Sequence, residues 1–274
     1  MATQLRDLLW GALDELRFQP IDKWIRAEVG GRTVVDTRRA RLVLEPRRVV
    51  GSYAVPETDL AAELVLDTGA AAEERPVEIG RRRVLDPSTP FRAHGAPGVS
   101  LTIRTPEAEL PGAGFRADDP DLAGYVILDW DAFDQWHEED EPVIAHPHDP
   151  FSRIDCLRSS RHVRIAHGEV LLADSRRPVI LFETGLPPRY YIPREDVVMS
   201  LLDPTPTATA CAYKGWASYW SARVGDTVLT DIAWSYPDPL NDALPVRDLI
   251  AFFSERLDVT VDGELQSRPN TPWS

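Results

Sequence analysis

The chain has 274 residues and a formal net charge of −14, from 30 Lys and Arg against 44 Asp and Glu. A chain of this length buries about 70–75% of its unfolded surface and forms one large domain or two of ordinary size. An acidic chain with no block of basic residues is a poor binder of phosphate backbones, because Lys and Arg drive that binding by releasing counterions. Nucleic acid is therefore not expected as a partner.

Cysteine content and hydropathy predict a cytoplasmic protein. The two cysteines, Cys156 and Cys211, are too few for the disulfide framework of a small secreted domain. Residues 1–18 lack the basic start and apolar run of a signal peptide. No segment reaches the roughly 18 apolar residues that a membrane helix needs. We expect free thiols and no membrane partner.

The first predicted element is an amphipathic helix within residues 1–19. Its leucines recur with the 3.6-residue period of a helix that buries one face: Leu5, Leu8, Leu9, Leu13 and Leu16. Most of the remaining chain has strand character. A second helix is predicted over residues 131–139. The segments 67–118 and 140–155, rich in Pro, Gly and charged residues, are predicted to be long loops and a connector.

An internal repeat covers two parts of the chain. Residues 24–45 resemble residues 162–183, and both copies continue into the pattern Y-x-x-P-x-x-D. Identical residues fall in register: Gly30 and Gly168, Glu45 and Glu183, and, after a one-residue gap, Tyr53 and Tyr190, Pro56 and Pro193, Asp59 and Asp196. Each copy opens with two short strands around a Gly-containing turn, which predicts a β-hairpin. We interpret the repeat as a duplication.

These features predict a mainly β fold made of two tandem copies of a small domain, with few short helices. The first, degenerate copy is expected over residues 20–140 and the second over residues 141–274. Only the second copy continues into A-T-A-C-A-Y-K-G-W-A-S-Y-W-S (208–221) and D-I-A-W-S-Y-P-D-P (231–239). We therefore expect any chemistry to lie in the second copy.

Three motifs of the second copy resemble a known family. They are Y-Y-I-P-R-E-D-V at residues 190–197, C-A-Y-K-G-W-A-S-Y-W at 211–220 and W-S-Y-P-D-P at 234–239. In this order they resemble the bacterial family called domain of unknown function 427, here in a tandem version. The resemblance implies a small β "tent", distantly similar in shape to methionine sulfoxide reductase B and related zinc-binding domains. The paired C-x-x-C ligands of those relatives are missing, and no phosphate-binding loop supports the nucleotidyltransferase-type label that the family has carried.

Residues 207–221 are predicted to form a hairpin with Lys214 and Gly215 as a two-residue turn. In that register Cys211 faces Ser218 and lies on a face that also holds three aromatic side chains. Lys214 lies three residues away at the tip, which argues against close contact between the lysine and the thiol.

Lys214, Cys211 and Glu183 are the candidate catalytic residues. Lys214, one of only two lysines in the chain, is predicted to bind an anion or act as a catalytic amine, or to be a solvated turn residue. Cys211 is either a nucleophile or redox thiol beside a cation, or a packed small hydrophobe. Glu183 follows a buried-looking strand and is either an acid or base, or the partner of a neighbouring Arg such as Arg189.

Aromatic residues are dense in the second copy. This density predicts either an aromatic-lined pocket for a small molecule or a core of cross-strand aromatic pairs. The candidate ligand-binding residues are Tyr190, Tyr191, Tyr219, Trp220, Trp234, Tyr236 and Arg189.

A metal or cofactor is not expected. His146 and His148 lie two residues apart, as metal ligands can, but a third ligand is not evident nearby and the flanking prolines favour a linker turn. No cofactor motif is present in the sequence.

The leading hypothesis is an enzyme that acts on a small molecule in the aromatic-lined pocket of the second copy. The alternative is a non-catalytic module that binds a metabolite or a protein. A third interpretation is a duplicated structural subunit in which each half completes the core of the other.

Overall fold

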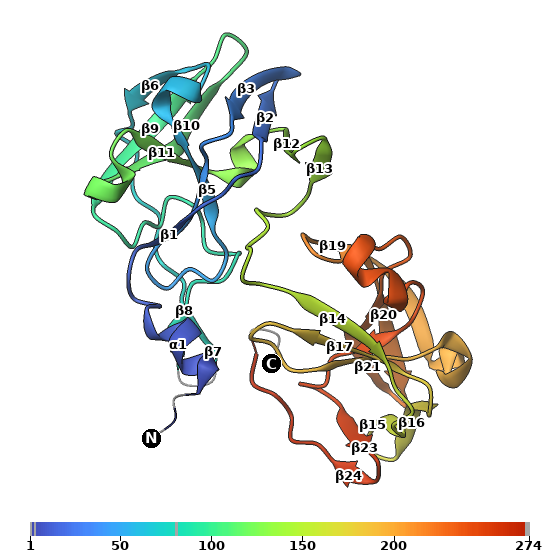
Figure 1. Ribbon diagram of the computed structural model, residues 1–274. Coiled ribbons are helices and arrows are strands. Elements are labelled where there is room, and N and C mark those ends of the chain that lie inside the picture. The colour runs from blue at the N-terminus through green and yellow to red at the C-terminus, as the bar shows by residue number, and fades with distance from the viewer. Residues whose placement is uncertain (1, 3, 80–81, 272–274) are drawn as a thin grey trace. The chain divides into compact units, whose positions relative to one another are not determined.

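The computed structural model describes residues 2, 4–79 and 82–271, in which the chain forms two compact units (Figure 1). The first unit is Met1–Asp149 and the second is Pro150–Ser274. The described residues are mainly strands and loops with short 3-10 helices, which confirms the predicted β class. No helix in this described part is long and apolar enough to cross a membrane.

The first unit contains a seven-stranded antiparallel sheet in the order β1-β4-β5-β11-β10-β9-β6. Its strands are β1 (Arg17–Pro20), β4 (Arg41–Leu44), β5 (Ser52–Pro56), β6 (Glu63–Leu66), β9 (Gly98–Arg104), β10 (Glu109–Ala117) and β11 (Tyr125–Leu128). The second sheet has the order β13-β12-β2-β3, with β2 (Ile25–Val29), β3 (Arg32–Thr37), β12 (Gln135–Glu138) and β13 (Glu141–Val143). A small hairpin pairs β7 (Val77–Ile79) with β8 (Arg82–Val84).

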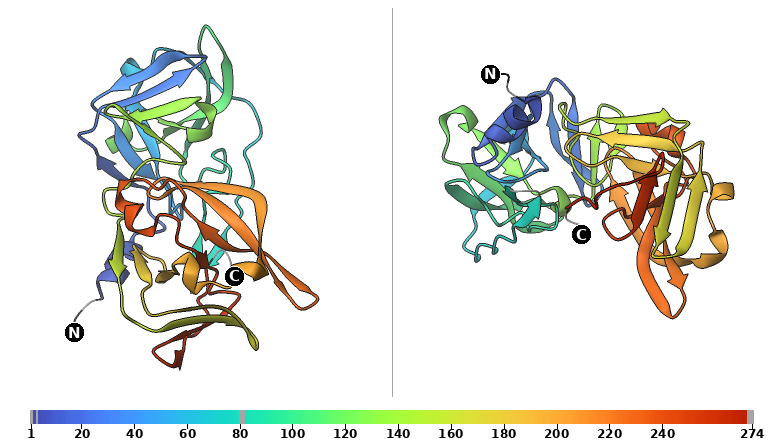
Figure 2. Two further views of the ribbon diagram at one scale, coloured as in Figure 1. Left: turned by 90° about the vertical axis from the view of Figure 1, so that its right-hand side faces the viewer. Right: turned by 90° about the horizontal axis from the view of Figure 1, so that it is seen from below.

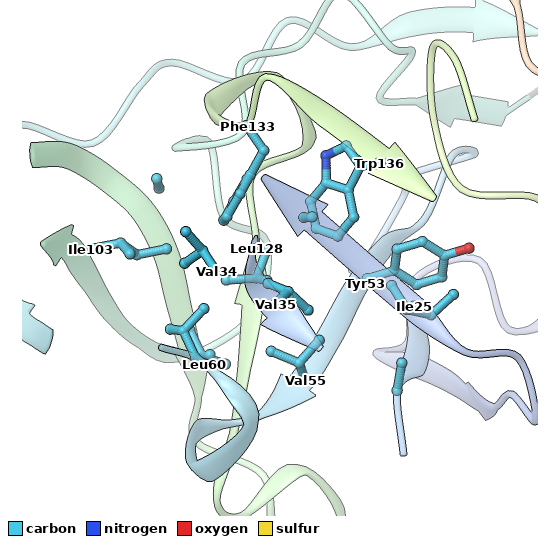
Figure 3. Close-up of a cluster of buried hydrophobic side chains, with 14 of the residues drawn as sticks. Ile25, Val34, Val35, Tyr53, Val55, Leu60, Ile103, Leu128, Phe133 and Trp136 are labelled. Atoms are coloured by element: carbon cyan, nitrogen blue, oxygen red, sulfur yellow. The ribbon is translucent and has the colours of Figure 1, made fainter. Parts of the chain in front are cut away.

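The core of the first unit lies where side chains of these two sheets meet (Figure 3). Along β2 the burial alternates, with Ile25, Ala27 and Val29 buried, which is the period-two pattern of a strand with one face inward. The Tyr53 and Trp136 rings, from β5 and β12, pack with centroids 5.7 Å apart. The core therefore joins strands that are about 80 residues apart in the sequence.

The second unit contains three antiparallel sheets. The first has the order β14-β17-β18, with β14 (Ile154–Arg158), β17 (Val179–Glu183) and β18 (Arg189–Tyr191). The second has the order β16-β15-β23-β24, with β15 (Val163–His167), β16 (Val170–Ser175), β23 (Asp258–Val261) and β24 (Glu264–Leu265). The third has the order β19-β20-β21-β22, with β19 (Leu202–Cys211), β20 (Gly215–Val224), β21 (Thr227–Ser235) and β22 (Ala251–Phe252). The long β20–β21 hairpin, orange in Figure 2, reaches beyond the other strands of this unit.

Both units use the same strand pairings in the repeated segments. The β2–β3 and β15–β16 hairpins each have a bulge after the third residue pair. The next two strands, β4–β5 and β17–β18, also pair in matching register. Corresponding pairs are Arg26–Asp36 and Arg164–Asp174, and Leu42–Tyr53 and Ile180–Tyr190.

The aspartate of the Y-x-x-P-x-x-D pattern ties a 3-10 helix to the hairpin in each unit. In η1 (Glu57–Asp59), Asp59 accepts hydrogen bonds from Thr37 Oγ1 at 2.6 Å and Arg39 Nη2 at 2.5 Å. The hydrogen bond from Arg39 is the main cause that lowers the pKa of Asp59. In η4 (Arg194–Asp196) the matching contacts are made by Ser175, Arg177 and Asp196. The repeated aspartate and arginine therefore have a structural role.

The N-terminal helix is shorter than predicted. The single α-helix among the described residues, α1, covers only Leu5–Gly11, and β1 begins within the predicted span at Arg17. Leu13 is buried, whereas Leu8 is exposed. The side chains of Leu5 and Leu9 lie outside the described part, so an amphipathic face stays a prediction.

Two local predictions are wrong. Residues 131–139 contain the strand β12 in place of a helix, because Trp136 and Glu138 alternate inward while the backbone pairs with β2 on one side and β13 on the other. The segment 67–118 contains the strands β7 to β10 in place of a long loop. In the segment 140–155, β13 and the start of β14 flank residues 144–153, which form no helix or strand and agree with the predicted connector. Burial of the Leu101 and Ile103 side chains stabilises β9, and this outweighs the low strand propensity of the surrounding Pro and Gly residues.

Candidate functional site

Lys214 is positioned by the turn between β19 and β20. Cys211 pairs with Gly215, so the turn consists of the three residues 212–214, and the Lys214 N–H donates to the Cys211 carbonyl at 3.2 Å. The predicted two-residue turn, with Cys211 facing Ser218, is therefore wrong. Gly215, the first residue after this loop, has a φ of 96°, a backbone conformation that glycine adopts more readily than other residues.

Gly215 also allows a close approach of the segment W-S-Y-P-D-P. A Cβ atom at this position would lie 3.2 Å from the carbonyl oxygen of Asp238. The N–H of Leu240 donates to the Lys214 carbonyl at 3.2 Å. Two of the three family-like motifs therefore meet here, and together they fix the backbone of Lys214.

Lys214 forms a mostly buried ion pair with Glu183, at the end of β17. Its Nζ atom lies 2.7 Å from each carboxylate oxygen, and the two side chains are 10% and 18% exposed. Burial acts to lower the pKa of Lys214, but the charge of Glu183, with a contribution from Cys211, raises the pKa above its ordinary value. Lys214 is therefore an ammonium at neutral pH, and it cannot act as a free-amine nucleophile.

Both cysteines of the chain lie within electrostatic reach of Lys214. The half-buried Cys211 side chain contributes to the raised pKa of Lys214. The register from which their separation was predicted is wrong, because Cys211 pairs with Gly215. Cys156 is half-buried on β14, where burial raises the pKa of its thiol and the charge of Lys214 opposes that rise. Cys156 was missed as a candidate, although it shares a strand face with the buried Ile154.

Four of the predicted aromatic residues gather beside this ion pair. Tyr191, Trp234 and Tyr236 belong to one buried cluster, and Tyr219 packs against it. The indole N–H of Trp234 donates to the Tyr191 hydroxyl at 3.1 Å. Burial raises the pKa of Tyr191 and of Tyr236. Both hydroxyls therefore stay protonated at neutral pH and can donate hydrogen bonds.

Of the other three predicted ligand-binding residues, Arg189 lies over the Trp234 ring, with Cζ 5.6 Å from the ring centroid, and Tyr190 and Trp220 lie elsewhere. Tyr190 and Trp220 pack against a different buried cluster, because successive residues of a strand point to opposite faces of the sheet. Arg189 is buried in a two-fold ion pair with Glu255, with N–O distances of 2.8 and 2.6 Å, so it is not the partner of Glu183. The structure therefore brings together Lys214, Glu183, Cys211, Tyr191, Tyr219, Trp234 and Tyr236.

In the first unit, the glutamate that aligns with Glu183 has different surroundings. Glu45 matches Glu183 in the repeat, is 3% exposed, and accepts hydrogen bonds from His94 Nδ1 at 3.0 Å and the Gly95 N–H at 3.1 Å. In the repeat alignment, Ala54 stands where the second unit has Tyr191. The first unit therefore has a buried carboxylate at this position but no tyrosine at the position of Tyr191.

A metal site is not evident in the described part of the chain, where no group of three or more His, Cys, Asp or Glu side chains could hold an ion. His148, a candidate ligand in the sequence, has its Nδ1 atom 3.1 Å from Glu138 Oε2. Glu138 also accepts hydrogen bonds from Tyr53 and Lys23. The histidine segment is therefore attached to the core of the first unit through Glu138.

The C-terminal part of the chain matches a known protein family. Residues 155–263 match the family described as Domain of unknown function (DUF427). The matched segment includes Lys214, Glu183, Cys211 and the four aromatic residues beside them. It agrees with the resemblance found in the sequence motifs for this part of the chain. A comparison with curated proteins found no match.

Proposed function

We propose that the second unit acts on a small polar molecule at the side chains of Lys214, Glu183 and Cys211, which we call the Lys214 cluster. The observation that carries the proposal is a buried Lys–Glu ion pair, with the charge of Cys211 contributing to the raised pKa of Lys214. A buried ion pair stabilises a fold no better than apolar residues of similar volume, so its presence favours a role in function. Perturbed titratable groups also gather at functional sites.

The geometry suggests a role for each group. An ammonium has three donors, and Glu183 accepts two of them. The third donor remains available to Cys211 or to a bound molecule, and a cysteine attacks an electrophilic carbon as its thiolate. Tyr191 receives the indole N–H of Trp234, so its own proton remains available for negative charge that develops on the bound molecule.

The alternative is a module that binds a metabolite or peptide without transforming it. Because Glu183 neutralises the charge of Lys214 and holds its side chain in place, the ion pair can serve ligand binding as well as catalysis. Trp216, which follows Gly215, is 58% exposed and offers an anchor for such a ligand next to the cluster.

Variants of the full chain separate these functions from a purely structural role. A library of small carbonyl compounds, esters and carboxylates is screened by thermal shift, where a ligand stabilises by RT ln(1 + [L]/Kd). For an enzyme, Cys211→Ser is expected to abolish turnover of a binding compound, whereas the control Cys156→Ser keeps turnover. For a binding module, both variants bind and no compound is turned over.

The double variant Lys214→Met/Glu183→Leu is the folded control without the ion pair. We expect it to lose ligand-induced stabilisation while keeping the native fold. Unchanged ligand shifts in this variant would contradict both functions.

We also propose that the two units are copies of one β-tent-like domain and that the first copy is degenerate. The matching registers of the two hairpin pairs and the buried carboxylates Glu45 and Glu183 support this proposal. Duplicated domains each have a core of their own. Residues 150–274 alone are therefore expected to unfold cooperatively in urea, and a non-cooperative transition would contradict the proposal.

A further inference from the structure

A second buried ion pair of the second unit lies beside the aromatic residues of the proposed site, and the proposed function does not use it. The Arg189 guanidinium, on β18, donates to the two carboxylate oxygens of Glu255 at 2.8 and 2.6 Å. The two side chains are 7% and 0% exposed. The guanidinium also donates to the Ser254 hydroxyl at 3.0 Å. This set of hydrogen bonds fixes the plane of the guanidinium as well as its position.

Residues 266–271, which we call the Thr271 segment, bring a further donor to this pair. Residues 264–268 are exposed, yet Thr271 is only 5% exposed. Its hydroxyl donates to the Oε1 atom of Glu255 at 2.6 Å. The segment lies outside residues 155–263, the part of the chain that matches the family. A segment beyond the matched part therefore reaches the buried interior of the second unit.

Glu255 joins the Thr271 segment to Arg189. Burial acts to raise the pKa of Glu255, but hydrogen bonds from Arg189 and Thr271 lower the pKa below its ordinary value, so the group is a carboxylate at neutral pH. Its Oε1 atom accepts from both of these side chains. A buried ion pair stabilises a fold no better than apolar residues of similar volume, so this network favours a role in fixing the geometry of its neighbours.

The neighbour that the guanidinium contacts is the Trp234 indole. The Cζ atom of Arg189 lies 5.6 Å from the centroid of the indole ring, within the range of about 6 Å at which a cation attracts an aromatic face. The Phe253 ring also packs against the indole, with the two centroids 4.6 Å apart. Together these contacts hold the orientation of the indole.

Trp234 in turn contacts Tyr191 in a defined geometry. The indole Nε1–H donates to the Tyr191 hydroxyl oxygen at 3.1 Å, and the two rings meet edge to face at 88°. An indole N–H is a donor only, so the tyrosine oxygen is the acceptor of this bond. The position of the indole therefore restricts the directions in which the Tyr191 hydroxyl can point its own proton.

We propose that Arg189 and Thr271 are positioning residues for the Trp234 indole. The indole directs the Tyr191 hydroxyl toward the molecule bound at the Lys214 cluster, so the inference rests on the function proposed for that cluster. The contacts run from Thr271 through the carboxylate and the guanidinium to the indole, and each link is a buried hydrogen bond or ring contact.

The test observes the Trp234 indole directly, in the full chain with ¹⁵N-labelled tryptophan, by nuclear magnetic resonance. Trp234→Phe identifies the Trp234 signal, and Trp220, which packs against a different buried cluster, is the internal reference. Thr271→Val keeps the shape of the side chain and removes the hydroxyl. We expect it to shift the Trp234 signal and to speed hydrogen exchange of that indole at least about threefold, with Trp220 unchanged.

Three further variants separate positioning from a general loosening of the fold. Thr271→Ser keeps the hydroxyl and should restore the native Trp234 signal and exchange rate. Arg189→Lys keeps the charge but loses the planar guanidinium, and should shift the Trp234 signal at least as far as Thr271→Val. Thr205→Val removes a matched hydrogen bond of the same unit, from Thr205 Oγ1 to Asp231 Oδ1 at 2.7 Å, and should leave the Trp234 signal unchanged.

The outcomes for this inference are distinct from those for the proposed function. An unchanged Trp234 signal in Thr271→Val, or equal acceleration of exchange at Trp234 and Trp220, would overturn the positioning role whatever the ligand screen finds. The expected Trp234 response supports the positioning role even when no compound binds, and that negative screen would contradict the proposed function alone.

Discussion

Replacement of Lys214 by methionine gives the sharpest test of the buried ion pair. The variant Lys214→Met keeps most of the side-chain volume but leaves the Glu183 carboxylate without its partner. Breaking a buried pair costs about 3–5 kcal/mol, and the 18% exposure of Glu183 places this pair at the lower end, about 3 kcal/mol. With a urea m value of about 2 kcal/mol per molar, the unfolding midpoint of the second unit should fall by about 1.5 M.

Two further variants test the cause of that loss. Lys214→Met/Glu183→Leu removes both charges and is expected to recover most of the lost stability, because apolar residues of similar volume replace a buried pair at little cost. Arg223→Met breaks an exposed pair of the same unit, whose side chains are 67% and 64% exposed, and should cost less than about 1 kcal/mol. Urea unfolding followed by circular dichroism measures all four proteins. The reasoning is refuted if Lys214→Met costs no more than Arg223→Met.

Three other outcomes follow from the structure. In urea unfolding, Gly215→Ala should destabilise the second unit by about 1–3 kcal/mol more than Gly225→Ala. Both glycines have a positive φ, but only a Cβ atom at Gly215 would meet backbone atoms of another segment. Equal losses of stability in the two variants would contradict this reasoning. The ion pair of Lys214 should stabilise the second unit fully below about pH 10, and this stabilisation should be lost as pH rises through the raised pKa of Lys214. In unfolding curves at alkaline pH, Glu183→Gln should remove this fall of stability with pH. In the first unit, burial acts to raise the pKa of Glu138, but hydrogen bonds from His148, Lys23 and Tyr53 lower it from 4.5 to about 2. Glu138 should therefore contribute about 3 kcal/mol above pH 4.5 and lose it as pH falls toward 2. Glu138→Gln should flatten the acid limb of unfolding curves, and an unchanged acid limb would show that Glu138 is not its source.

Local patterns in the sequence predicted local structure well. The β class and the repeated hairpins follow from alternating apolar residues around Gly-containing turns, and the structure pairs Arg26 with Asp36 and Arg164 with Asp174 in the same way. The helix predicted over residues 131–139 failed because tertiary pairing with β2 overrode the local pattern.

The site was predictable in its residues but not in its pairings. Glu183 was expected beside Arg189, six residues away, yet its partner is Lys214, 31 residues away, because the turn after Cys211 brings the lysine back over the end of β17. A Lys-Gly sequence is compatible with a two-residue or a three-residue turn, and the contact of Gly215 with the Asp238 backbone, which favours the second, is long-range.

Some of what was missed could have been found. Tyr190 and Tyr191 are adjacent on one strand, as are Tyr219 and Trp220, so only one member of each pair can face a common site. The strand period would therefore have separated the seven aromatic and basic candidates into two faces. The same two-residue period places Cys156 on the same strand face as the buried Ile154.

The most direct test of the Lys214 cluster as a reactive site is the rate at which iodoacetamide alkylates Cys211 in the native chain. The rate is followed peptide by peptide, with Cys156 as the internal reference and the urea-unfolded chain as the accessible limit. The account predicts that native Cys211 reacts faster than Cys156, whose thiol pKa is raised by burial, and that Lys214→Met/Glu183→Leu slows the reaction. Alkylation of Cys211 that occurs only on unfolding, or at the same rate without the ion pair, would contradict it.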